Sequence, residues 1–120
     1  MITMTTQQVA DRFYELSQQN GYEHIQTELY SKDAKSIEPN DELFKNATGL
    51  DAIMAKGKQF NEMIEAVHDG YCSKPLVAGN FFTCTMGMDV TLKGQPRMKM
   101  DEVAVYEVKD GKIVLEQFFF

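Results

Sequence analysis

The segment MKMDEVAVYEV, residues 98–108, decides the fold class because its apolar side chains recur at every second position. That period is typical of a β-strand with one buried face, whose residues here are Met98, Met100, Glu102, Ala104, Tyr106 and Val108. Glu102 is the one charged residue among them. Because burying an unpaired charge is costly, its carboxylate must find a partner, stay protonated or line a wet cavity. The last two alternatives describe a pocket, which makes Glu102 the first candidate for a functional residue.

Turn sequences around this strand predict that its neighbours run antiparallel to it. They lie at positions 69–70, 79–80, 93–94 and 110–111, and the runs between them alternate in hydrophobicity. A three-residue loop at 93–95 would place Asp89 opposite Lys99, whereas a longer loop would place Asp89 opposite Asp101. The shorter loop also matches Phe82 with Tyr106, and it sets the register that we expect.

A two-residue turn at 110–111 would set the register of the last strand against the same segment. It places Ala104 opposite Gln117 and Glu102 opposite Phe119. Gln117 therefore joins Glu102 as a polar residue of the inner face. The other face carries an apolar patch, which a symmetric dimer most commonly buries, and its residues are Val103, Val105, Phe118 and Phe120.

The first third of the chain has the pattern of two consecutive helices. Thr5 or Thr6 can cap the first helix, and Asn20 followed by Gly21 offers a left-handed stop. The second helix follows directly and is expected to end near residues 31–33. Both helices carry one apolar face, so we expect them to pack on the sheet.

A short strand and a third helix complete the first half of the chain. The strand is expected at 34–38, where Pro39 halts it. The third helix begins in the capping-box-like sequence 48–51, carries a long apolar stripe and ends near Glu65. The chain thus has helices in its first half and an antiparallel meander in its second.

The composition excludes several classes of function. With 120 residues, 43% hydrophobic residues and a formal net charge of −6, the chain reads as one globular domain without a nucleic-acid-binding surface. No apolar run is long enough to span a membrane and no signal-peptide pattern begins the chain, so a cytoplasmic location is the default. Cys72 and Cys84 show no metal-ligand spacing; two free thiols are favoured over a disulfide, and we expect no metal.

The order of these elements resembles the nuclear transport factor 2-like superfamily, in its SnoaL-like and ketosteroid-isomerase-like branch. The sequences that carry the resemblance are ELYSKDA at 28–34, IEP at 37–39, GLDAI at 49–53 and VYEVKDGKI at 105–113. The resemblance covers nearly the whole chain and implies a single domain over residues 1–120. It also implies a cone-shaped α+β fold, in which a curved, mainly antiparallel sheet and three helices enclose a pocket, usually in a homodimer.

The resemblance also implies candidate catalytic residues. In the ketosteroid isomerase pattern the strand-ending acid before a proline is the general base, and Glu38 matches that position. The tyrosine that donates to the substrate oxygen falls on Phe13, and Tyr14 should point about 100° away around the helix. The second acid of that site falls near Glu102 or Ala104. Glu38 could instead be a solvated acid, and Glu102 a buried acid with a structural partner.

These features give two hypotheses about function. The first is cofactor-free proton transfer on a small apolar carbonyl compound, with Glu38 as base and a protonated Glu102 as hydrogen-bond donor. The second is a non-catalytic ligand-binding or dimerisation module with the same fold. Both expect a small apolar ligand and no cofactor, and the candidate ligand-binding residues are Tyr14, His68, Met86, Met100, Tyr106 and Gln117.

Overall fold

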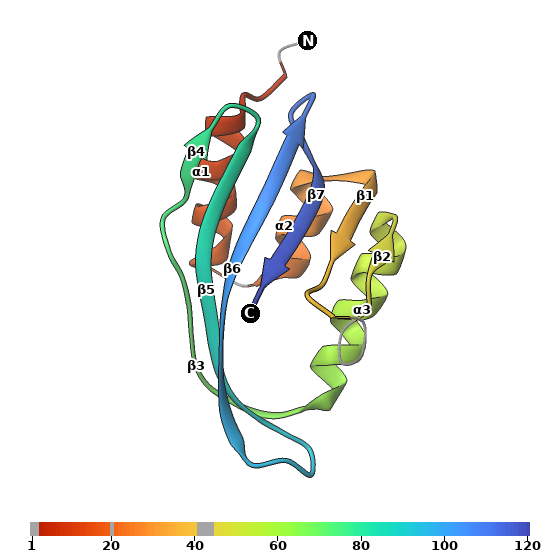
Figure 1. Cartoon of the computed structure of the whole chain (residues 1–120), viewed down its shortest axis with the longest axis vertical. Helices are drawn as coiled ribbons and strands as arrows, with labels where there is room; N and C mark the ends of the chain where they lie inside the picture. The colour runs from red at the N-terminus through yellow and green to blue at the C-terminus, as the bar shows by residue number, and fades with distance from the viewer. Residues whose placement is uncertain (1–2, 20, 41–44) are drawn as a thin grey trace.

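A computed structural model describes residues 3–19, 21–40 and 45–120. Within these residues three helices, α1 (Thr6–Ser17), α2 (Tyr22–Leu29) and α3 (Leu50–Met63), lie against one side of a seven-stranded sheet (Figure 1). The predicted α+β class is confirmed. None of the helices in the described ranges is long and apolar enough to cross a membrane.

The sheet is mixed and mainly antiparallel, as expected. Its strands are β1 (Tyr30–Ile37), β2 (Ala47–Thr48), β3 (Ile64–Cys72), β4 (Leu76–Ala78), β5 (Phe81–Leu92), β6 (Arg97–Lys109) and β7 (Lys112–Phe119). They are ordered β2-β1-β7-β6-β5-β3, with β4 also paired to β5, and only β1 and β7 run parallel. The hairpin of β5 and β6 extends far beyond the end of β7 (Figure 1). The sheet does not close into a barrel.

The first helix begins where the sequence predicts it. The Thr5 side chain accepts a hydrogen bond from the Gln8 backbone, and the Gln8 side chain accepts one from the Thr5 backbone, which makes a capping box. Asn20, part of the predicted stop, lies outside the described residues. Gly21 has a φ of 98° and is the N-cap of α2.

The predicted boundaries of the next elements need correction. Helix α2 ends at Leu29, and β1 begins at Tyr30 because pairing with Ile113 of β7 draws that residue into the sheet. Helix α3 begins at Leu50 but has no side-chain cap, since its N-cap is Gly49. It ends at Met63, slightly before the predicted end near Glu65, where pairing of β3 with β5 takes over.

The turn predicted at Asp69 and Gly70 is wrong, because both residues lie inside β3. The register of β3 against β5 shifts between Val67 and Asp69, and the Asp69 carboxylate accepts a hydrogen bond from the Gly70 backbone. An Asp-Gly pair therefore marks a β-bulge here rather than a chain reversal.

The register predicted for β5 and β6 is confirmed. Asp89 lies opposite Lys99, and Phe82 opposite Tyr106, as the three-residue loop requires. Glu102 lies opposite Met86 on the inner face.

The register predicted for β6 and β7 is wrong by one residue. The two-residue turn is present, with Asp110 and Gly111 at φ values of 51° and 76°. Between Glu107 and Val108, however, a bulge shifts the pairing of β6 with β7. Glu116 therefore replaces Gln117 as the polar residue that β7 contributes to the inner face.

The same bulge corrects the outer face. Phe118 lies opposite Ala104, an inner residue, whereas Phe119 lies opposite Val103. Phe118 and Phe120 thus leave the predicted outer patch and lie on the side of the sheet that faces the cavity, where Phe120 remains exposed, and Phe119 joins the patch.

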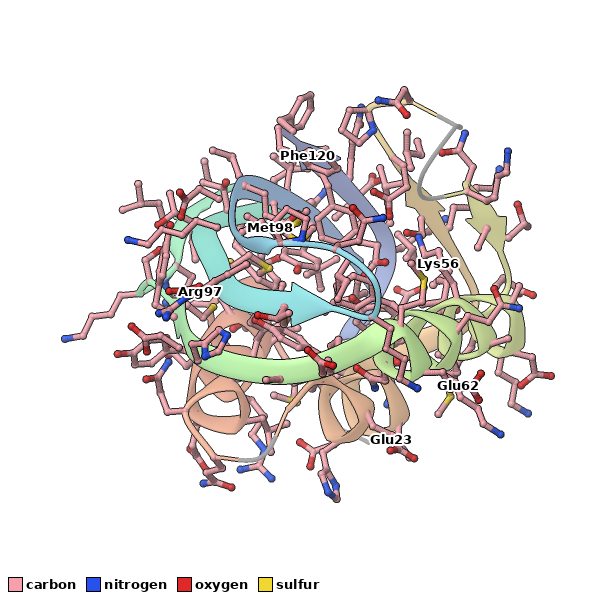
Figure 2. The ribbon with its side chains drawn as sticks, turned by 90° about the horizontal axis from the view of Figure 1, so that it is seen from below. Glu23, Lys56, Glu62, Arg97, Met98 and Phe120 are labelled. Atoms are coloured by element: carbon pink, nitrogen blue, oxygen red, sulfur yellow. The ribbon has the colours of Figure 1, made fainter. Side chains whose placement is uncertain are left out.

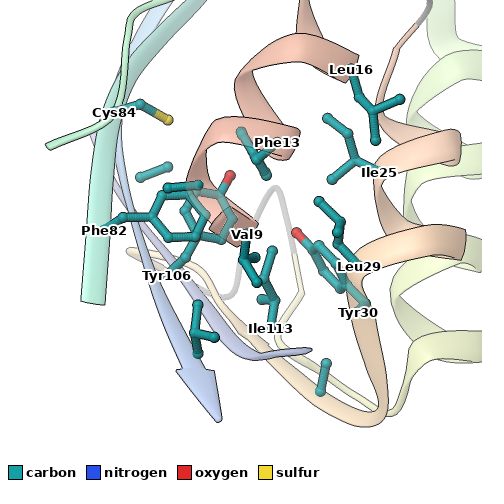
Figure 3. Close-up of a cluster of buried hydrophobic side chains, with 14 of the residues drawn as sticks. Val9, Phe13, Leu16, Ile25, Leu29, Tyr30, Phe82, Cys84, Tyr106 and Ile113 are labelled. Atoms are coloured by element: carbon teal, nitrogen blue, oxygen red, sulfur yellow. The ribbon is translucent and has the colours of Figure 1, made fainter. Parts of the chain in front are cut away.

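The core lies between helices α1 and α2 and the strands of the sheet (Figure 3). Phe13 of α1 packs against Tyr106 of β6 and Phe82 of β5, with ring centroids 4.7 Å and 5.4 Å away. Phe82 and Tyr106 are cross-strand neighbours and stack at 4.9 Å. This aromatic cluster borders the cavity, because Tyr106 also lines it.

Candidate functional site

A cavity of about 450 Å³ lies between the helices and the inner face of the sheet. Its volume is within the range of small-molecule binding sites, roughly 300–1,000 Å³. Much of its wall is apolar and adaptable, and its methionine and phenylalanine side chains are Phe60, Met86, Met88, Met100, Phe118 and Phe120. Figure 2 views the molecule from the hairpin end, with Lys56 and Phe120 labelled.

Glu116 of β7 is the centre of a buried hydrogen-bond network in this wall. Only 4% of the residue is exposed. The Tyr30 hydroxyl donates to one carboxyl oxygen and the Ser36 hydroxyl donates to the other, at 2.6 Å from Ser36. The parallel pairing of β1 and β7 sets Ser36 directly opposite Glu116. Burial raises the pKa of Glu116, and the two hydrogen bonds oppose that rise.

Lys56 of α3 connects this network to the predicted base. Its ammonium group donates to the Ser36 hydroxyl at 2.6 Å and to the Glu38 carboxylate at 2.8 Å. The side chains of Glu38 and Lys56 are only 7% and 19% exposed. Glu38 is therefore not a solvated acid at a strand end but an ion-paired carboxylate in the cavity wall.

Glu102 of β6 lines the same cavity without such partners. Its carboxyl group accepts no hydrogen bond from the described residues, and none of their fully buried polar side-chain atoms lacks a partner. The Glu102 carboxyl oxygens are therefore not fully buried, and the residue lines the cavity. Burial raises the pKa of Glu102 to about 7, the charges of Glu38 and Glu116 add to the rise, and Lys56 opposes it.

The structure brings together five of the eight residues predicted for the site. Glu38, Glu102, Met86, Met100 and Tyr106 all line the cavity. Their roles in binding or catalysis stay predictions.

The other three predicted residues lie elsewhere. Tyr14 follows the buried Phe13 on α1 and is turned away from the cavity. His68 is exposed on β3, where its Nε2 atom lies 2.9 Å from the Thr91 hydroxyl. Gln117 is moved off the inner face by the bulge between β6 and β7.

The sequence reasoning missed Tyr30, Ser36, Lys56 and Glu116. Lys56 had a detectable signal, because it lies three residues after Ile53 and four before Phe60, on the stripe of α3 that faces the cavity. Glu116 had none, because it faces the cavity only through the bulge.

Comparisons with known proteins agree with this architecture. Residues 4–120 match the family model described as the SnoaL-like domain. The crystal structure of a proposed SnoaL-like polyketide cyclase from Mesorhizobium loti, whose name also contains carbohydrate phosphatase, has a TM-score of 0.91 and 33% identity. That match covers 98% of this chain and 100% of the other. No curated protein sequence matches this chain.

More distant crystal structures share the fold alone. A protein of ketosteroid isomerase-like fold from Catenulispora acidiphila, in complex with trimethylamine, is 19% identical with a TM-score of 0.73, covering 97% of this chain and 87% of that one. A proposed SnoaL-like polyketide cyclase from Jannaschia is 14% identical with a TM-score of 0.73. That match covers 95% of this chain and 83% of the other.

Proposed function

This chain belongs to the SnoaL-like domain family, and we propose that its cavity performs cofactor-free acid–base chemistry on a small, largely apolar carbonyl compound. The observation that carries the proposal is the pair of unlike carboxyl groups in one cavity. Glu38 lies beside the Lys56 ammonium group, whereas Glu102 has a pKa raised to about 7. Two carboxyl groups that lie in one site but have such different surroundings are typical of an acid and a base that work together.

In the proposed reaction Glu38 removes a proton from the carbon next to the carbonyl group. Glu102, protonated below about pH 7, donates a hydrogen bond to the carbonyl oxygen as the enolate forms. The negative charge of Glu38 contributes to the raised pKa of Glu102, so the two groups interact electrostatically across the cavity. The methionine and phenylalanine side chains hold the apolar part of the substrate and exclude water.

The use of a carboxylate as the base restricts the choice of substrate. A carboxylate such as Glu38, held by the Lys56 ammonium group at 2.8 Å, is a weak base for removing a proton from carbon. The proposed substrate therefore has a C–H bond made acidic by a second carbonyl group or an aromatic ring. Polyketides, the class in the name of the Mesorhizobium loti relative, contain carbons of this kind.

The test is hydrogen–deuterium exchange at the α-carbon of 2-tetralone, an apolar ketone activated by an aromatic ring. The wild-type protein in deuterated buffer near pH 6 should accelerate the exchange, followed by proton NMR, over buffer alone. Glu38→Gln and Glu102→Gln should each slow the enzymatic exchange by at least about tenfold, as expected for loss of a base or a donor. Glu65→Gln, at an exposed position on β3, is the matched control and should exchange at the wild-type rate.

Binding without exchange would instead support the alternative, a non-catalytic ligand-binding module. One observation favours that alternative: Phe13 occupies the position where the ketosteroid isomerase pattern has a tyrosine, and it is packed in the aromatic core. Saturable line broadening of 2-tetralone with no gain in exchange over buffer would contradict the catalytic proposal.

We also propose a homodimer through the outer face of the sheet. Large apolar side chains are exposed there, with exposed fractions of 75%, 45%, 41% and 49% for Leu76, Phe81, Val103 and Phe119. Light scattering should give twice the chain mass at micromolar concentration. Val103→Glu should dissociate the dimer, whereas Val67→Glu, at an exposed position of β3, should not. A wild-type monomer would contradict the proposal.

A further inference from the structure

The two cysteines of the chain meet at the wall of the cavity. Cys72 is the last residue of β3 and Cys84 lies within β5, and their sulfur atoms are 3.8 Å apart as free thiols. Cys72 pairs with Met86, so Cys84 is its diagonal neighbour on the same face of the sheet. The backbone bond from Ser73 to Thr85, at 2.8 Å, continues the pairing and holds the two strands together here.

The two thiols differ in access. Cys72 is half-buried and lines the cavity, whereas Cys84 is only 4% exposed. A small reagent in the cavity can therefore reach Cys72 directly, while Cys84 is shielded.

The two thiols also differ in acidity. Donation of a hydrogen bond from Cys84 to a Cys72 thiolate lowers the pKa of Cys72, Ser17 and Tyr22 add to that effect, and burial opposes it. The same contact and burial raise the pKa of Cys84. A reactive thiolate beside a protonated thiol is the arrangement found in dithiol redox sites.

We propose that Cys72 and Cys84 are a peroxide-reactive dithiol site, in which Cys72 is the attacking thiol and Cys84 resolves it to an intramolecular disulfide. This site is independent of the proposed acid–base chemistry, since it uses neither Glu38 nor Glu102.

The oxidant is hydrogen peroxide or an organic hydroperoxide. The Cys72 thiolate attacks the peroxide oxygen that carries a hydrogen, the O–O bond breaks, and the departing hydroxide or alkoxide takes up one proton from solvent to give water or an alcohol, which leaves a sulfenic acid on Cys72. The Cys84 sulfur then attacks the Cys72 sulfur, the S–O bond breaks, and the hydroxyl group leaves as water with the Cys84 proton. Two thiols lose two electrons, and the peroxide gains them.

The local geometry allows the second step with a small movement. The sulfur atoms must approach from 3.8 Å to a bond length of about 2 Å. Cys72 ends its strand, so the movement has to displace the hydrogen bonds between Ser73 and Thr85 but leaves the rest of the β3 and β5 ladder paired. The Cys84 sulfur therefore lies close to the Cys72 sulfur in the folded protein, without any unfolding.

The test treats the full-length protein with one equivalent of hydrogen peroxide under native conditions. The intact mass should fall by two hydrogen atoms, both thiols should disappear together, and dithiothreitol should restore them. Peptide mapping should recover a Cys72–Cys84 crosslink within one chain. This measurement needs no variant and so does not depend on whether a variant folds.

Two variants separate the roles of the thiols. Cys84→Ser should leave a sulfenic acid on Cys72 that dimedone traps. The first equivalent of peroxide should be consumed at close to the wild-type rate, because the serine hydroxyl group can still donate a hydrogen bond to the Cys72 thiolate. Cys72→Ser should consume peroxide at least about tenfold more slowly, because the remaining thiol is buried and protonated. Equal rates in the two variants, or wild-type protein that accumulates sulfinic acid or intermolecular disulfides, would overturn the proposal.

Discussion

Glu116 on β7 and Glu102 on β6 both face the cavity, but only Glu116 has hydrogen-bond donors directed at it. Tyr30 and Ser36 serve the two oxygens of Glu116, and Lys56 reaches the same Ser36 hydroxyl. Glu102 accepts no hydrogen bond from the described residues and has a pKa raised to about 7, mainly by burial. Two glutamates thus line one cavity, one with hydrogen bonds to both carboxyl oxygens and the other with none from the described residues.

The difference separates a structural acid from a functional one. A buried polar group with complete hydrogen bonding fixes its surroundings, and removing it leaves its partners unsatisfied. A desolvated carboxyl group without partners contributes nothing to that order and remains free to meet a ligand. We therefore assign Glu116 to the fold and propose Glu102 for function.

The largest expected effect is on stability, from Glu116→Ala. The change leaves the buried hydroxyl groups of Tyr30 and Ser36 without their shared acceptor, so the free energy of unfolding should fall by about 3 kcal/mol. Urea unfolding at neutral pH measures it. Glu65→Ala, at an exposed position on β3, should stay within about 0.5 kcal/mol of wild type. A loss below about 1 kcal/mol for Glu116→Ala would contradict the assignment of Glu116 as a residue that stabilises the fold.

The next effect is a pH dependence that belongs to Glu102. Because its pKa in the folded protein, about 7, lies above its ordinary value of 4.5, the folded state binds more protons than the unfolded state between these values. Stability from this group is complete below about pH 4.5 and is lost as the pH rises to about 7.

Glu102→Gln removes this pH-linked loss. Relative to wild type, the variant should gain about 2 kcal/mol of unfolding free energy between pH 4.5 and pH 8, after allowance for solvent in the cavity. Urea unfolding of both proteins at the two pH values gives the difference, in which the titration of all other groups cancels. A difference that does not change with pH would show that Glu102 titrates normally.

The smallest effect compares two tyrosines. Tyr30→Phe removes a hydrogen bond to the Glu116 carboxyl group and should cost about 1.5 kcal/mol. Tyr14→Phe is the matched control, because the Tyr14 hydroxyl group has no hydrogen-bond partner among the described residues and its loss should cost no more than about 0.5 kcal/mol. Equal losses in thermal or urea unfolding would mean that the network around Glu116 adds nothing to the fold.

The sequence was sufficient for the strand that carries Glu102. Its alternating pattern identified the inner face, and the loop at 93–95 set the register in which Asp89 meets Lys99. Such inferences succeed because the side-chain period of a strand and the length of a hairpin loop are local properties.

The sequence was insufficient for the strand that carries Glu116. One extra residue in β7 puts Glu116, instead of the predicted Gln117, on the inner face. Nothing in the local sequence pattern marks that bulge. The network is also non-local, since it joins Tyr30 and Ser36 of β1 to Lys56 of α3 through a parallel strand pair. Periodicity predicts which face a residue occupies, but not which distant residues face it.

The most direct measurement of the difference between the two glutamates is a carbon-13 NMR titration of the side-chain carboxyl groups in protein labelled at glutamate. The Glu102 signal is assigned by its absence from Glu102→Gln, and its chemical shift is followed from pH 4 to pH 9. We predict a midpoint near 7, because burial and the charges of Glu38 and Glu116 disfavour the carboxylate. A midpoint near the ordinary value of 4.5 would contradict the assignment of Glu102 as the protonated donor of the cavity.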